Sequence, residues 1–186
     1  ARAMADQIDF TGLGHASVVS IGGIRTGSFY AGELNWMWVG TPPEGFAQSF
    51  YSYCVDVSQN LRDPQTVSVR STEGFTNGAV DGGAKAAWLV NEYAQSVRQT
   101  ANVATANILA AGLQVAIWEA MYDTVRDLTV GNFQLTGASL SNGVRNQADV
   151  YLTALYTNAS LPYNTSVATL VEVASPNLGQ DQIVSR

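Results

Sequence analysis

The sequence predicts an α+β fold, an antiparallel β-sandwich or barrel that carries a helical insertion of about three helices. β-branched and aromatic residues dominate the first third of the chain, between clusters of glycine and proline. Apolar residues then follow the three-and-four spacing of helices over about 84–158, and strand-like segments return near the end. Strands on both sides of a helical segment indicate a single domain over 6–186, whose β part covers about 6–75 and 160–186.

The expected strands are short apolar segments separated by turns such as Gly22-Gly23 and the glycine- and proline-rich stretch 40–45. They cover residues 15–21, 28–39, 47–57, 65–70, 166–173 and 182–184, and 132–135 fits either a strand or a loop. Three helices are expected at 84–98, 103–123 and 142–158. The second is the most apolar, with a stripe of alanine, leucine and isoleucine side chains typical of a helix that packs against a core.

Composition excludes several classes of function. The chain has 186 residues, of which 46% are hydrophobic, so it can fill one substantial core. Its net charge is −6 and no run of lysine or arginine occurs, so nucleic acid is not an expected partner. Gln114 and Glu119 interrupt the longest apolar region, so no membrane span is expected there. Residues 1–6 lack the apolar core of a signal peptide, so an export signal was either removed or never included.

Cys54 is the only cysteine, so an internal disulfide is excluded. The simplest interpretation is a buried small hydrophobic residue, the commonest role of a free cysteine. Cys54 stands in an aromatic-Cys-aliphatic-Asp motif, Tyr53-Cys54-Val55-Asp56, and Gln114 follows on the second helix in Leu113-Gln114-Val115-Ala116-Ile117-Trp118-Glu119.

Strand and helix periodicity suggest how the two residues meet. Alternation along the third strand separates two faces, and the expected core face is Tyr51, Tyr53, Val55 and Val57, opposite Phe50, Ser52, Cys54 and Asp56. At about 100° per residue, Gln114 lies on the shoulder of the apolar stripe beside Trp118, with Val115 and Glu119 towards solvent. If this helix covers the Cys54 face, the two side chains come together.

The ordered pair of motifs resembles the signature of bacterial surface thioester domains, in which a cysteine and a glutamine are joined as an internal acyl thioester. The resemblance implies a Cys54–Gln114 bond, with Tyr53, Asp56 and Trp118 in supporting roles. It also implies single-use covalent capture of an amine or hydroxyl on a surface protein or polysaccharide, without enzymatic turnover, cofactor or metal. Leu113 departs from the family, which commonly has a polar residue before the glutamine.

Residues 177–184 resemble the segment that precedes the Pro-Glu-Pro sorting tag of exported proteins, although the tag itself is absent. This likeness implies an extracellular or cell-surface protein that meets a membrane only through a removed C-terminal sorting segment. The sequence predicts no oligomeric state.

Other functions rest on weaker patterns. A non-reactive structural or carbohydrate-binding module is the main alternative, with Trp36 and Trp38 as a stacking platform, although alternation favours burying one and leaving the other at an edge. A hydrolase would need His15, the only histidine, beside Cys54. The remaining patterns are calcium binding by Asp63, Glu73 and Asp81, which are expected to be solvated turn carboxylates, and glycosylation at 158–160 and 164–166.

Overall fold

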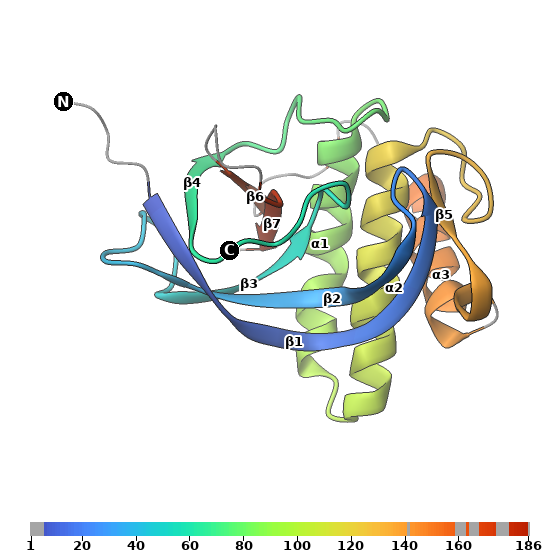
Figure 1. Ribbon diagram of the computed structural model, residues 1–186, viewed down its shortest axis with the longest axis horizontal. Helices are drawn as coiled ribbons and strands as arrows, with labels where there is room; N and C mark the ends of the chain where they lie inside the picture. The colour runs from blue at the N-terminus through green and yellow to red at the C-terminus, as the bar shows by residue number, and fades with distance from the viewer. Residues whose placement is uncertain (1–5, 141, 159–162, 164–167, 174–178, 186) are drawn as a thin grey trace.

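The computed structural model describes residues 6–140, 142–158, 163, 168–173 and 179–185. It confirms the α+β fold: three helices accompany one antiparallel sheet of seven strands (Figure 1). In chain order the elements are β1 (Asp6–Gly23), β2 (Gly27–Trp38), β3 (Ser49–Cys54), β4 (Gln65–Arg70), α1 (Gly82–Gln99), α2 (Val103–Tyr122), β5 (Phe133–Leu135), a 3₁₀ turn (Gly137–Leu140), α3 (Gly143–Asn158), β6 (Ala168–Val173) and β7 (Gln182–Ser185).

The strands close into a barrel. The sheet order is β2-β3-β7-β6-β4-β1-β5, and β1 pairs also with β2, so that six strands form a closed ring with β5 attached to β1. Of the two architectures predicted, the barrel is therefore the one formed. The late strands β6 and β7 lie between β4 and β3, which explains why both ends of the chain contribute to a single unit.

The first strand is much longer than the predicted segment 15–21. β1 pairs with β4 near Asp6 and with β2 along most of its length, and two irregularities in register fall around Gly12 and between Leu13 and Ala16. These bulges keep the ladder intact where the alternation of side chains breaks, so Gly12 and Gly14 lie inside the strand. The β1–β2 ribbon extends beyond the barrel and curves around the helices to β5 (Figure 1).

Helix α2 is the central element of the core. It begins after Asn102, whose side chain accepts a hydrogen bond from the Thr105 main-chain N–H at 2.9 Å. Every residue from 110 to 122 is buried, because α1, α3 and the β1–β2 ribbon pack around it. The prediction that Val115 and Glu119 face solvent is wrong, since both have no exposed surface.

Among the described helices, only α2 is long and apolar enough to cross a membrane by length and composition. Its most apolar window is 67% buried inside the protein, which is ordinary for the core helix of a globular domain. The expectation of no membrane span in this region stays a prediction.

The end of the chain is part of the barrel. Of the segment 177–184, residues 177 and 178 lie outside the described part of the chain, Gly179 forms a parallel bridge with Asn60, and Gln182 begins β7. The glycosylation pattern at 164–166 also lies outside the described residues, as do residues 159 and 160 of the other.

Candidate functional site: two pockets on opposite faces of β2 and β3

Strand β3 ends at Cys54 rather than at Val57 as predicted. The carboxylate of Asp56 accepts hydrogen bonds from both the main-chain N–H and the hydroxyl of Ser58, which turns the chain out of the strand. The Tyr122 hydroxyl donates to the same carboxylate oxygen at 2.9 Å and connects this turn to the end of α2. Asp56 therefore shapes the turn after Cys54 and does not line the pocket described next.

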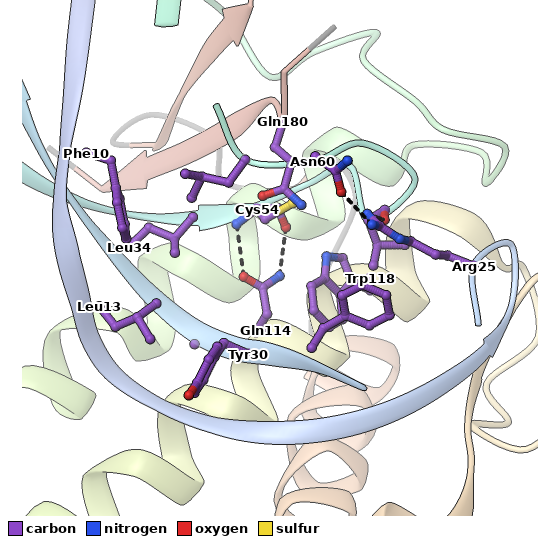
Figure 2. A pocket seen from close by; sticks show the side chains of 14 residues that line it. Phe10, Leu13, Arg25, Tyr30, Leu34, Cys54, Asn60, Gln114, Trp118 and Gln180 are labelled. Atoms are coloured by element: carbon purple, nitrogen blue, oxygen red, sulfur yellow. Dashed lines mark hydrogen bonds between the residues drawn. The ribbon is translucent and has the colours of Figure 1, made fainter. Parts of the chain in front are cut away.

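The predicted pair, Cys54 and Gln114, comes together in the fold. The side-chain oxygen of Gln114 accepts a hydrogen bond from the Cys54 main-chain N–H at 2.9 Å, and its nitrogen donates to the Cys54 carbonyl at 2.7 Å (Figure 2). Both residues are buried, with exposed fractions of 3% and 1%. The amide thus occupies the place of a neighbouring strand at the end of β3, where the ladder with β2 has stopped at Ser52.

The pocket around this pair is mostly apolar. We call it the thioester pocket, after the bond that the resemblance predicts there. Its volume is about 430 Å³, and Cys54, Gln114 and Trp118 contribute to its wall. The other lining residues come from the β1–β2 ribbon and from the loops after β3 and before β7, and Figure 2 draws them as Phe10, Leu13, Arg25, Phe29, Tyr30, Gly32, Leu34, Val57, Asn60, Leu61 and Gln180.

Arg25 fixes the loop that forms one side of this pocket. Its guanidinium donates to the carbonyls of Val57 and Gln59 at 3.3 and 2.9 Å, and also to the Asn60 side chain. The same group lies 4.5 Å from the centre of the Phe29 ring. Three acceptor atoms of one short loop and one ring are therefore held around a single charge, which gives the pocket a defined wall.

The thiol of Cys54 is held in its neutral form. Burial raises its pKa well above the ordinary value, and the charge of Asp56 acts in the same direction. The Asp56 main-chain N–H and the Trp118 indole oppose this rise. The indole Nε1 has no partner in hydrogen-bond geometry within the described part of the chain, so its influence on the sulfur is a weak one.

The core face expected from alternation is confirmed for Tyr53, Val55 and Val57, which are buried, and is wrong for Tyr51, which is 44% exposed. The opposite face is buried as well, at Phe50, Ser52 and Cys54. Ser52 accepts from the Trp36 indole at 2.9 Å and donates to Gln182 at 2.8 Å, a buried polar chain beside Cys54 that the sequence did not indicate.

Tyr53 lies away from the thioester pocket. Its hydroxyl donates to the Glu33 carboxylate at 3.4 Å, on the other face of β2 and β3. There a second pocket, also about 430 Å³, is lined by polar side chains that include Glu33, Asn35 and Arg98. We call it the polar pocket. Sequence reasoning missed it, although an acidic residue within an apolar strand was a usable signal.

The remaining candidates are separated. His15 lines the polar pocket, so it is not paired with Cys54. Trp36 and Trp38 are both buried, which contradicts the expectation that one lies at an edge and removes them as an exposed stacking platform. Within the described ranges no group of three or more His, Cys, Asp or Glu is placed to hold a metal ion, and Asp63 instead accepts from the Phe10 main-chain N–H at 2.8 Å.

Comparison with known proteins gives no match: no protein-family model, no curated protein and no solved structure is significantly similar to this chain. By its fold and the geometry of its site, the protein is a β-barrel with a helical insertion and a buried Cys-Gln pair.

Proposed function

We propose that this protein is a surface thioester domain, in which Cys54 and Gln114 form an internal thioester that captures an amine or hydroxyl on a partner. The observation that carries the proposal is the double hydrogen bond between the Gln114 amide and the Cys54 main chain, at 2.9 and 2.7 Å. It holds the one glutamine amide on this helix against the one cysteine of the chain, inside an apolar pocket.

The orientation of the amide favours attack by the thiol. In a strand, the main-chain N–H and C=O lie in the plane of the sheet and the side chain stands perpendicular to it. Because the Gln114 amide is bonded to both Cys54 groups, it lies near that plane, and the Cys54 side chain projects to one side of it. A nucleophile reaches a carbonyl carbon from outside the carbonyl plane, and the Cys54 side chain stands on such a side.

The reaction balances without a cofactor. The Cys54 sulfur bonds to the side-chain carbonyl carbon of Gln114, the carbon–nitrogen bond breaks, and the thiol proton leaves with the nitrogen as ammonia. During the step the Cys54 main-chain N–H stabilises the negative charge that develops on the Gln114 oxygen. An incoming amine or hydroxyl then bonds to the same carbon, and the sulfur regains a proton as it leaves.

The buried thiol also favours a long-lived bond. A sulfur whose conjugate thiol has a raised pKa is a poorer leaving group, so the thioester reacts more slowly with water. The apolar lining lowers the local concentration of water further.

Intact mass under non-reducing conditions tests the proposal. The purified chain is expected to be lighter than its sequence mass by one ammonia, and Cys54→Ala is expected to restore the full mass of that variant. Lys85 is the only lysine, and an isopeptide bond from it would also release ammonia, so Lys85→Arg serves as the control and is expected to keep the deficit. Methylamine should add to Gln114 and expose a titratable thiol. A full mass on fresh protein would refute the proposal.

One observation favours a second candidate, a non-reactive extracellular module in which Gln114 only completes the barrel. The Gln114 amide satisfies the Cys54 N–H and C=O, which β2 leaves unpaired, and that gives the residue a structural role without any reaction. Methylamine separates the candidates, because only the thioester yields an adduct together with a new thiol.

A further inference from the structure

The polar pocket holds a buried carboxylate with little internal support. Glu33 has no exposed surface, and among the described residues its Oε1 accepts two long contacts, from the Tyr53 hydroxyl at 3.4 Å and from Arg98 at 3.5 Å. Burial raises the pKa of this carboxylate, and the His15 main-chain N–H, which also lies near it, lowers the pKa. The Oε2 of Glu33 has no hydrogen-bond partner among the residues that the structure describes. Buried polar atoms are normally satisfied, so an open carboxylate oxygen beside a cavity indicates a missing donor.

A second acceptor is open at the same place. The Oδ1 of Asn35, two residues along β2 on the same face, also lacks a partner within the described residues. Both oxygens converge on Gly14 of β1: a Cβ added there would lie 3.1 Å from Glu33 Oε2 and 3.1 Å from Asn35 Oδ1. No side chain at Gly14 therefore stands between these two neighbouring acceptors, whose residues line the pocket although both oxygens are buried.

The rest of the pocket supplies donors and aromatic surface. Arg98, from α1, lies 5.4 Å from the centre of the Tyr51 ring, and its side chain is 29% exposed. Tyr51 and Tyr30 line the pocket and are 44% and 64% exposed. With a volume of about 430 Å³, the pocket falls in the range that small-molecule sites occupy.

The charges decide the class of ligand. A cationic ligand would approach Glu33 but would meet Arg98 in the same pocket, and an anionic ligand would meet the carboxylate. A neutral molecule with several hydroxyl groups avoids both conflicts. Its hydroxyls can donate to Glu33 and Asn35 and accept from Arg98, while tyrosine rings pack against its carbon-bound hydrogens.

We propose that the polar pocket is a reversible binding site for a neutral saccharide, recognised by Glu33, Asn35 and Arg98 with Tyr51 and Tyr30 at its rim. Tyr30 and Leu13 line this pocket and the thioester pocket alike, so the two pockets adjoin at these residues. The inference that a polysaccharide is the covalently captured partner rests on the proposed function. The inference of reversible saccharide binding does not.

Saturation-transfer NMR with neutral disaccharides (maltose, cellobiose, lactose and N,N′-diacetylchitobiose) tests the site. The Cys54→Ala protein is used, because it cannot form a thioester and so keeps this result separate from the first proposal. At least one sugar is expected to bind at millimolar concentration. Glu33→Gln, which keeps an acceptor for Tyr53, is expected to weaken that binding at least about tenfold through loss of the charged acceptor.

Tyr51→Ala changes a side chain that is 44% exposed, so this variant should fold and still lose binding. Val18→Ala, at an exposed position of β1 outside the polar pocket, is the matched control and should bind normally. Three results would overturn the proposal: no binding of any of the four sugars, binding unchanged in both pocket variants, or Glu33-dependent binding of methylammonium with none of the sugars.

Discussion

The two faces of the β2–β3 strand pair differ in how their buried polar groups are satisfied. Alternate residues of β2 and β3 lie on opposite sides of the sheet: Leu34 and Cys54 line the thioester pocket, and Glu33, Asn35 and Tyr51 line the polar pocket. On the first face the Gln114 amide and the Cys54 main chain satisfy each other. On the second, two buried acceptors lack a partner within the described residues.

This difference separates two requirements. A group that is to react once must be held in one position, and the two hydrogen bonds of Gln114 do so. A group that is to bind reversibly must leave hydrogen-bonding capacity for the ligand, as Glu33 and Asn35 do. One strand pair can meet both requirements only because its side chains alternate.

The largest expected effect comes from removing the hydrogen bonds of Gln114, on the thioester-pocket face of the strands. In the Cys54→Ala background, which has no thioester, Gln114→Ala removes both partners of the residue 54 main chain in a buried position. We expect the free energy of unfolding to fall by about 2–4 kcal/mol, measured by urea denaturation. Saccharide binding to the folded fraction should be unchanged.

Gln95→Ala, at an exposed position of α1, is the matched control for this substitution and should change stability by less than about 0.5 kcal/mol. If Gln114→Ala behaves like Gln95→Ala, the amide does not complete the barrel, and the contrast between the two faces loses its basis.

A smaller effect is expected from a third buried acid, Glu119 on α2, which lines neither pocket. Burial raises its pKa to about 8 from an ordinary 4.5. The folded protein therefore binds more protons than the unfolded chain between these values, and the free energy of unfolding must fall as pH rises through that range.

Glu119→Gln should flatten this pH profile, because the titrating carboxyl is gone. The local structure should persist, since the amide oxygen can still accept from the Asp127 main-chain N–H. Part of the slope below about pH 6 should persist, because burial also raises the pKa of Asp181 to about 6. Urea denaturation from pH 5 to 8 provides the measurement. An unchanged pH profile in Glu119→Gln would mean that Glu119 is ionised in the folded protein. Loss of sugar binding in the same variant would mean that a buried carboxylate outside the polar pocket also affects binding.

The smallest effect concerns the boundary between the pockets. Tyr30→Ala removes a side chain that is 64% exposed and lines both. Stability should change by less than about 0.5 kcal/mol, whereas the rate of methylamine addition should rise about threefold as access to Gln114 widens. Val18, which faces Tyr30 across β1 and β2, provides the control: Val18→Ala should leave the rate unchanged. Equal rates in both variants would show that Tyr30 does not limit access.

The sequence predicted the elements with strong periodicity. The α+β class, the three helices and the pairing of Cys54 with Gln114 followed from spacing and from the motifs, and Gln114 does cover the end of β3. Barrel closure could not be chosen over a sandwich, since it depends on β6 and β7 inserting between strands distant in sequence.

The errors share one cause, which is that packing around an element is not visible in its own pattern. Val115 looked solvent-facing on a helix wheel, yet α2 is enclosed on several sides. Tyr51 looked like core, yet it lies at the rim of a pocket. The polar pocket itself joins residues of β1, β2, β3, α1 and α2, so no single stretch of sequence contained its signal.

The enclosure of α2 has a mechanical consequence. If acyl transfer leaves a partner bonded to Gln114, a pull on that partner is applied to the most deeply buried helix of the domain and not to a loop or a chain end. Yielding would then require α2 to separate from α1, α3 and the β1–β2 ribbon together. A partner attached at Gln114 would therefore be released by force only when the packing of the whole core is disrupted.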